Sequence, residues 1–184
     1  MGLSHSPSIV TANLLLNVDA TNPRNYDGTE NYFRYSEELT NATWGINNIG
    51  ASVDTSILPP VYGMPVYKMT ESTDSVSSQH LFAQSPIVPA IGDVYTLSCY
   101  VKAGTRTAAC ITAFGEGYSA FNLTTGTVIQ SGGNIVNIFP ADNGWYRIFA
   151  TITKTNTTAQ VFLIPWNGGN SYIGNGSYFY ATLS

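Results

Sequence analysis

The side chains best suited to ligand chemistry lie in one short segment, Trp166-Asn-Gly-Gly-Asn-Ser-Tyr172. It brings two aromatic rings and two amides together on what its glycines indicate is a loop. Sugar rings stack on exposed aromatic side chains, and their hydroxyls exchange hydrogen bonds with amides. We therefore predict a glycan contact whose candidate members are Trp166, Asn167, Asn170, Tyr172 and, from a second loop, Tyr118.

These aromatic residues also have a purely structural interpretation, to which we give more weight. Large aromatic side chains dominate protein cores, and tyrosine is enriched where subunits meet. Under this interpretation Trp44 and Trp145 are core residues, Tyr146 and Tyr172 pack the sheets, and the remaining tyrosines contact neighbouring subunits. A glycan contact and a subunit contact are therefore alternative uses of the same residue types.

The spacing of the acids gives little support to catalysis. A glycoside hydrolase holds two carboxylates at a set separation across a cleft, whereas the acids here are scattered through expected turns. The two histidines, His5 and His80, have no cysteine or acid at zinc-binding spacing. We predict a protein that is not an enzyme and that uses no metal and no cofactor. The acids considered are Glu30, Glu37, Glu38, Asp54, Glu71, Asp74, Asp93, Glu116 and Asp142.

The charge of the chain argues against two classes of partner. Charged residues make up 10% of the sequence, and the formal net charge is −4. No basic stripe is present to neutralise phosphates, so we predict neither a nucleic-acid partner nor an anionic membrane partner. No run of residues approaches the length of about 18 apolar residues that a membrane span needs. So low a charge suggests a surface that neighbouring molecules partly cover.

Two cysteines, Cys99 and Cys110, lie on either side of an expected turn. In a regular hairpin they would stand directly opposite each other. Cross-strand pairs seldom meet disulfide geometry without strain, so we favour two reduced thiols that fill space as small apolar side chains.

Short runs with a two-residue period are the main structural signal. In residues 95–102 every second side chain, from Tyr95 to Val101, is suited to a core, and residues 145–153 repeat the pattern from Tyr146 to Ile152. Such runs separated by turns predict an all-β protein, an antiparallel jelly-roll-like β-sandwich. The expected strands are 49–53, 66–70, 79–84, 95–102, 107–114, 119–122, 127–130, 135–139, 145–153, 160–164 and 178–183, with a further strand at 32–35 and one helical turn at 36–41.

The first thirty residues differ from the rest. They combine an apolar run with a turn-rich stretch, so we predict an extended N-terminal arm and linker over 1–30 and a β-sandwich domain over 31–184. An exposed apolar strand can pair with the free edge of a neighbouring sheet. The arm residues predicted to make this contact are Ile9, Val10, Leu14, Leu15, Leu16 and Val18.

Four phrases follow one another along the body of the chain. They are Asn31-Tyr-Phe-Arg-Tyr-Ser-Glu-Glu-Leu-Thr-Asn-Ala-Thr-Trp44, Leu97-Ser-Cys-Tyr-Val-Lys-Ala-Gly104, Phe121-Asn-Leu-Thr-Thr-Gly-Thr-Val128 and Asn143-Gly-Trp-Tyr-Arg147. Their order resembles a family of β-sandwich domains, similar to carbohydrate-binding modules, that recur in structural proteins of tailed bacteriophages. The arm segment 14–26 separately resembles the shortened opening of laminin-G-like or concanavalin-like domains.

This resemblance implies a bacteriophage virion structural protein: a capsid decoration or cement protein, or another surface appendage. It implies virion proteins (capsid or tail subunits) as partners, a homo-oligomer such as a trimer, and a location in the virion after assembly in the cytoplasm of the host bacterium. The alternative is a carbohydrate-binding module that recognises host-surface glycans, as in a tail fibre or receptor-binding protein. A glycan-degrading enzyme ranks last.

Overall fold

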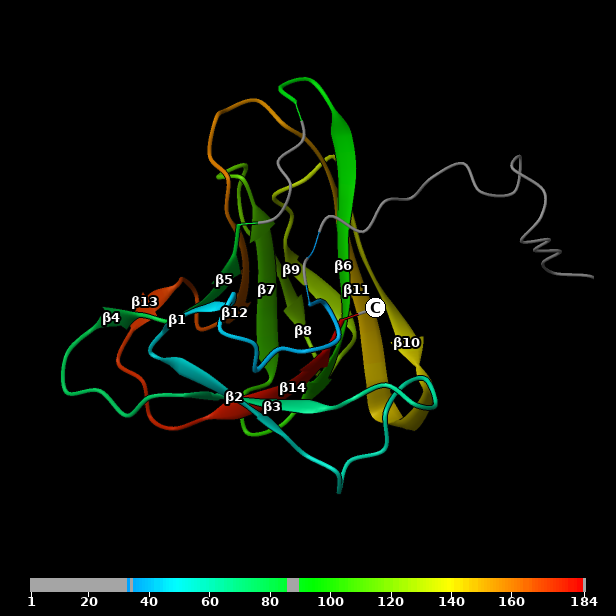
Figure 1. The fold of residues 1–184 in the computed structure, drawn as a ribbon, viewed down its shortest axis with the longest axis vertical. Coiled ribbons are helices and arrows are strands. Elements are labelled where there is room, and N and C mark those ends of the chain that lie inside the picture. The colour runs from blue at the N-terminus through cyan, green and yellow to red at the C-terminus, as the bar shows by residue number, and fades with distance from the viewer. Residues whose placement is uncertain (1–32, 34, 86–89, 184) are drawn as a thin grey trace, which may run out of the picture. The chain divides into compact units, whose positions relative to one another are not determined.

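The computed structural model describes residues 33, 35–85 and 90–183, which all belong to the unit that spans residues 32–184. These residues form two six-stranded antiparallel sheets and one small two-stranded ladder (Figure 1). Within them the single helical element is a short 3-10 turn, Asp142–Gly144. The prediction of an antiparallel, jelly-roll-like β-sandwich is confirmed, whereas the arm and its predicted contact residues lie outside the described residues.

Within each sheet, several strands that are far apart in the sequence lie next to each other. The first sheet, here called sheet A, has the order β1 (Gly45–Asn47), β5 (Leu81–Gln84), β12 (Val161–Pro165), β7 (Ala108–Ala113), β8 (Ser119–Asn122) and β9 (Thr127–Gln130). Sheet B has the order β10 (Ile135–Ala141), β11 (Trp145–Thr153), β6 (Val94–Ala103), β14 (Tyr178–Thr182), β3 (Tyr67–Glu71) and β2 (Ile49–Val53). The small ladder pairs β4 (Ser78–Gln79) with β13 (Ser171–Tyr172).

The two-residue alternation of the sequence determines which side chains enter the core. In β11, Ile148, Ala150 and Ile152 are buried and alternate with more exposed residues. Their register partners on β6 include Cys99 and Leu97, which are buried in the same cluster. A strand with this period buries one of its faces in the core. Each sheet also has a second, outer face, and the two outer faces differ in what covers them.

Of the strand predicted at 32–35 the structure describes only Phe33 and Tyr35, neither of which is in a strand, and residues 36–41 form no helical element. Tyr35 has a φ of 55°, and the N–H of Glu38 donates to the carbonyl of Tyr35, so this part of the chain folds as turns. The prediction that Trp44 is a core residue is confirmed. Its ring stacks between Phe33 and Phe82, with centroids 5.7 and 4.9 Å away, and it is 5% exposed.

The cysteines do not face each other across a hairpin, because β6 and β7 belong to different sheets. Cys99 lies between the sheets, whereas Cys110 lies in a separate cluster on the outer face of sheet A. Both are free thiols, as predicted. Burial raises the pKa of Cys99 to about 12 and also raises the pKa of Cys110, so neither thiol ionises readily.

The proline-rich loop between β2 and β3 covers the part of the outer face of sheet B around Trp145. Under this loop lies Trp145, which is 1% exposed and packs with Val66 and Tyr180. The indole N–H of Trp145 donates to the carbonyl of Leu58 at 2.8 Å, and the Asn143 side chain donates to the carbonyl of Pro59 at 2.9 Å. Trp145 is therefore buried as predicted, but beneath a loop instead of between the sheets.

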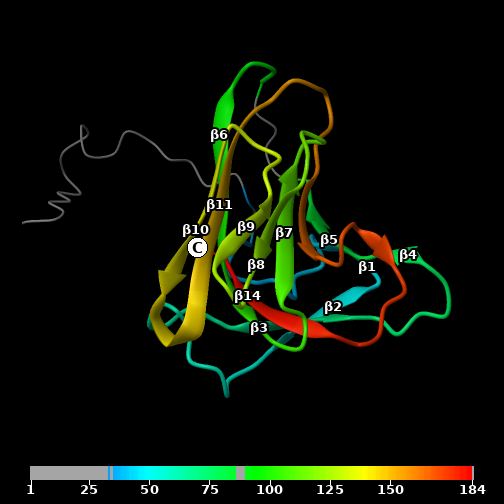
Figure 2. The same ribbon diagram turned by 180° about the vertical axis from the view of Figure 1, so that it is seen from behind.

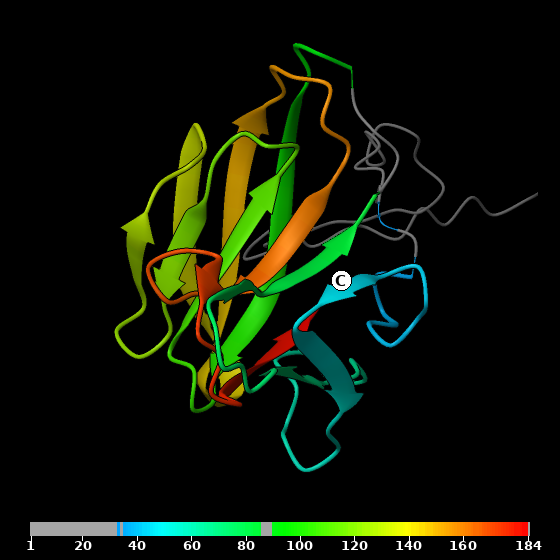
Figure 3. The same cartoon turned by 90° about the vertical axis from the view of Figure 1, so that its left-hand side faces the viewer.

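Figures 1 and 2 show β10 and β11 on one side of the body and the β4–β13 ladder on the other. Figure 3 faces the ladder side, where β12 is drawn in orange within sheet A. No helix among the described residues is long and apolar enough to cross a membrane.

Candidate functional site

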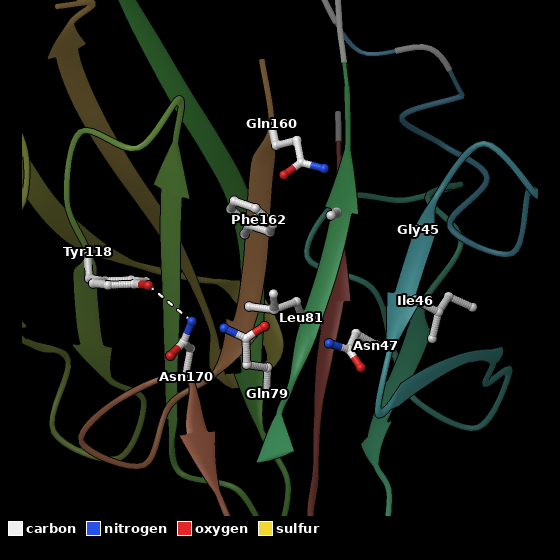
Figure 4. Close-up of a pocket in the computed structure, with 10 residues that line it drawn as sticks. Gly45, Ile46, Asn47, Gln79, Leu81, Tyr118, Gln160, Phe162 and Asn170 are labelled. Carbon is white, nitrogen blue, oxygen red and sulfur yellow. Dashed lines mark hydrogen bonds between the residues drawn. The ribbon is translucent and has the colours of Figure 1, made fainter. Parts of the chain in front are cut away.

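The candidate site is a groove on the outer face of sheet A (Figure 4). Its larger hollow has a volume of about 490 Å³, and a second hollow of about 370 Å³ shares three of its lining residues. The first is lined by Gly45, Ile46, Asn47, Gln79, Leu81, Ala83, Tyr118, Gln160, Phe162 and Asn170, and the second by Thr43, Gly45, Ala83, Gln84, Ser85 and Gln160. The two hollows together make one groove across β1, β5 and β12.

The floor of the groove is apolar because of strand alternation. In β5 the side chain of Phe82 is buried in the core, so its neighbours Leu81 and Ala83 face outward and are half-buried. Phe162 of β12 is the register partner of Ala83, and it is half-buried between the core residues Val161 and Leu163. These outward apolar groups are available to pack against a flat, weakly polar surface of a ligand.

The walls of the groove carry amides. The Asn170 side chain donates to the hydroxyl of Tyr118 at 3.1 Å, which fixes the position of both groups. Within the described part of the chain, the side-chain amides of Asn47, Gln79 and Gln160 make no hydrogen bond. Each amide offers two donors and one acceptor oxygen. Three unpaired amides above an apolar floor can therefore exchange several hydrogen bonds with a polar ligand.

No acidic or basic side chain lines either hollow of the groove. An anionic ligand would find no counter-charge there, and a cation would find no carboxylate. Hydrolysis of a glycosidic bond by a pair of carboxylates has no pair to use among these lining residues. The groove is suited to binding a neutral, hydroxyl-rich molecule.

The structure places only two of the five predicted glycan residues, Asn170 and Tyr118, at the groove. Trp166 is 7% exposed, and its ring lies 5.6 Å from that of Tyr118 in a cluster with Cys110 and Ile164. Trp166, a predicted glycan contact, is thus mostly buried on the outer face of sheet A and lines neither hollow. It packs against Tyr118, which lines the larger hollow.

Tyr172 is also buried and lines neither hollow of the groove. The residue is 8% exposed, and its hydroxyl lies 2.6 Å from a carboxylate oxygen of Glu71 and 3.0 Å from the carbonyl of Pro165, two acceptors that share its one proton. Burial, together with the Glu71 carboxylate, raises the pKa of Tyr172. The structural interpretation of Tyr172 thus fits its position. Asn167 is exposed on the same loop but lines neither hollow.

A buried polar cluster, which sequence reasoning missed, lies behind the groove. One guanidinium nitrogen of Arg106 lies 2.6 and 2.9 Å from the two carboxylate oxygens of Glu71. His80 is fully buried, stacks on Tyr172 at 4.2 Å and has its Nε2 2.9 Å from Asp74. One signal was available, because Glu71 continues the inward-facing series that starts at Tyr67 and Met69 in β3.

This cluster fixes two walls of the groove. The backbone N–H of His80 donates to the backbone carbonyl of Asn170, and the pairing of β4 with β13 places Gln79 opposite Ser171. The two segments pack so closely that a Cβ at Gly174 would lie 2.5 Å from Nε2 of His80, which leaves room for glycine only. Gln79 and Asn170 therefore stand beside a packed polar cluster in which Glu71 and His80 are closed to solvent.

Within the part of the chain that the structure describes, no group of three or more His, Cys, Asp or Glu side chains could hold a metal ion. Asn143 uses its side chain to hold the loop over sheet B.

Comparison with known proteins adds no relative. No protein-family model matches the chain, and no curated protein matches it significantly.

Proposed function

We propose that the protein is a non-enzymatic binding module that takes a neutral glycan chain in the groove of sheet A. The observation that carries this proposal is the lining of the groove. Unpaired amides of Asn47, Gln79 and Gln160 surround an apolar floor, and no charged side chain is present. Binding sites of this kind use a few well-placed polar groups for orientation and apolar surface for contact.

The chemistry of a neutral sugar matches both parts of the groove. A sugar ring has hydroxyls around its rim, which amides can bind as donors and as acceptors. Its C–H faces are weakly polar and can rest on Leu81, Ala83 and Phe162. Because the two hollows share Gly45, Ala83 and Gln160 and their lining runs from Leu81 to Ser85, the groove has room for more than one sugar ring. A chain of sugars therefore fits better than a single end sugar.

The test is a binding screen against cellohexaose, xylohexaose, mannohexaose and maltohexaose, with polygalacturonate as the anionic comparison. We expect a neutral oligosaccharide to bind and the polyanion not to bind. Gln160→Ala and Asn47→Ala should each weaken binding by about tenfold, the usual effect of losing one or two hydrogen bonds.

A matched control is Gln130→Ala, which removes an exposed amide from β9, outside the groove. It should leave the affinity unchanged. Equal losses from Gln130→Ala and Gln160→Ala, or preferential binding of polygalacturonate, would overturn the proposal.

A second candidate function is that of a structural component of a bacteriophage virion, which binds neighbouring subunits. The observation that favours it is an exposed apolar tip on the loop that covers Trp145 on sheet B. Tyr62 is 101% exposed, and Leu58 and Val61 are 67% and 46% exposed. The backbone behind them is held by Trp145 and Asn143. Side chains presented on a held backbone lose little entropy on binding, as in protein-binding hot spots.

One sheet edge is a poor receptor for a pairing strand. In the edge strand β10 the N–H of Ile138 donates to the side chain of its neighbour Asn137, and Pro140 has no N–H. Such features make an edge strand less able to form hydrogen bonds with a strand of another molecule. The assembly proposal therefore depends on the tip at Tyr62 and, as a prediction, on the arm residues outside the described range.

The two candidates are separable by locating the protein in an assembled particle by cryo-electron microscopy. Copies spread over a capsid lattice with Tyr62 against a neighbour support decoration. Few copies at a tail tip with an open groove support glycan recognition. A contact that uses neither the tip nor the arm would contradict the assembly candidate.

A further inference from the structure

Three Asn-Gly pairs occur in the described part of the chain, and each could undergo the same spontaneous reaction. They are Asn143-Gly144, Asn167-Gly168 and Asn175-Gly176. In an Asn-Gly pair the glycine nitrogen can attack the side-chain carbonyl carbon of asparagine, because glycine has no Cβ to obstruct the approach. The reaction needs a side chain that can rotate and a glycine N–H that is free to lose its proton. The structure shows which pairs meet these needs.

Hydrogen bonds hold two of the three pairs. Asn143 donates from its side chain to the carbonyl of Pro59 at 2.9 Å, and its own carbonyl accepts from Lys102 at 2.6 Å. The side-chain oxygen of Asn175 accepts from the N–H of Ser177 at 3.0 Å and from its hydroxyl at 2.5 Å. The N–H of Gly176 donates to the carbonyl of Ser72. Attack at either pair must first break these bonds.

The third pair is unrestrained. Asn167 is exposed, and its side chain makes no hydrogen bond among the described residues. The N–H of Gly168 has no backbone acceptor among them either. Gly168 has a φ of 81°, and, its adjacent residues aside, no atom lies within 4 Å of the position that a Cβ would take at Gly168 or at Gly169. Nothing in the described structure opposes the rotation that brings the glycine nitrogen to the asparagine side chain.

We propose that Asn167 is a self-modification site, which deamidates faster than Asn143 and Asn175. The nitrogen of Gly168 loses its proton and forms a bond to Cγ of Asn167, and the C–N bond of the side-chain amide breaks to release ammonia. Water then opens the five-membered imide at either carbonyl. The products are aspartate, or isoaspartate with one additional backbone carbon, and the overall change is the gain of water and the loss of ammonia.

The modification changes the charge of a neutral surface. It makes the net charge of the chain, −4, one unit more negative. The new carboxylate lies on the loop that carries Asn170, a wall of the uncharged groove. In isoaspartate the additional backbone carbon also lengthens the path between Trp166 and Asn170. This inference does not depend on whether the groove binds a glycan.

The test is to incubate the full chain at 37 °C and pH 8 and to follow each pair by peptide mapping with mass spectrometry. We expect Asn167 to convert at least about tenfold faster than Asn143 or Asn175, since each of the slower sites must break hydrogen bonds first. Ion-exchange chromatography should resolve a growing, more acidic form. Conversion of Asn143 or Asn175 at an equal or higher rate would overturn the proposal, as would an unchanged Asn167.

Two controls distinguish an effect of the folded structure on the deamidation rate from an effect of the local sequence. In urea the three pairs have lost their folded contacts, so their rates should converge, and a persistent tenfold difference would assign the effect to local sequence. Asn167→Gln should abolish the acidic form without shifting the unfolding transition, because the side chain is exposed and makes no hydrogen bond in the described structure. Persistence of that acidic form in the Asn167→Gln protein would likewise contradict the assignment.

Discussion

Each outer face of the sandwich carries a buried tryptophan, but only the tryptophan of sheet B lies beneath a loop. On sheet B, Trp145 is covered by the loop between β2 and β3, and the carbonyl of Leu58 satisfies its indole N–H. On sheet A, Trp166 and Tyr118 pack beside each other and leave the surface over β5 and β12 uncovered. An outward-facing aromatic residue is therefore a poor guide to a binding site, and the presence or absence of a covering loop is a better one.

The largest effect should come from removing the covered ring on sheet B. Trp145→Ala should lower the free energy of unfolding by about 3–5 kcal/mol, as for other large buried rings. Trp145→Phe keeps most of the packing but leaves the carbonyl of Leu58 without its donor, and should cost about 1 kcal/mol. Urea unfolding measures both. A loss below about 1 kcal/mol for Trp145→Ala would mean that the loop does not bury Trp145.

The next effect should come from the buried polar cluster behind the groove. Arg106→Ala leaves Glu71 buried without its counter-charge and should destabilise the protein by about 3 kcal/mol. Adding Glu71→Gln to this variant removes the unpaired charge and should restore part of the loss. A double variant as unstable as Arg106→Ala would contradict the role of Glu71 as a buried ion.

Low pH should destabilise the folded protein by protonating one carboxylate near each tryptophan face: Asp74 beside the groove and Asp54 in the covering loop. Hydrogen bonds from Ser72 and Ser78 lower the pKa of Asp74 beside the groove, and hydrogen bonds from Ser56 lower that of Asp54 in the covering loop. A lowered pKa stabilises the folded state above the ordinary value of 3.8. This contribution is lost as the pH falls below 3.8 and through the lower, folded value.

Asp74→Asn should therefore be less stable than the unchanged protein at pH 6 and should lose less stability on acidification to pH 2. Urea unfolding across this range measures the difference. An unchanged pH dependence in both Asp74→Asn and Asp54→Asn would show that these carboxylates are not stabilised as their contacts indicate.

The smallest effect is a difference in thiol reactivity. Cys110 lies beneath Trp166 on the open side of sheet A, whereas Cys99 lies between the sheets. Local opening of the loop at Trp166 should expose Cys110, while Cys99 needs the sandwich to open. Cys110 should therefore react faster with a thiol reagent in the native protein, which single Cys→Ala variants can show. Faster reaction of Cys99 would reverse the assignment of the open face.

The fold could be predicted from the sequence because strand alternation is a local property. The sequence predicts that every second side chain from Tyr95 to Val101 and from Tyr146 to Ile152 faces inward. The structure confirms this alternation. The short strands β1 and β13 were missed, since two or three residues carry too little periodicity. The break between β4 and β5 falls at His80, whose burial depends on Tyr172 from the far end of the chain.

The groove could be predicted only in part. Tyr118 and Asn170 were found because they accompany glycines and other polar residues in loops. Asn47, Gln79 and Gln160 come from separate parts of the sequence, and only the order of β1, β5 and β12 in sheet A brings them together. The burial of Trp166 depends on how its loop returns to the sheet, which no local pattern encodes.

The central claim is that the uncovered face of sheet A binds a neutral glycan. Its most direct test is a two-dimensional ¹H–¹⁵N NMR titration of the labelled protein with each of the four neutral hexasaccharides. The account predicts that a binding sugar shifts the side-chain amide signals of Asn47, Gln79 and Gln160 and leaves Tyr62 unchanged. Shifts confined to the loop at Tyr62, or no shift at the three amides with any of the sugars, would contradict it.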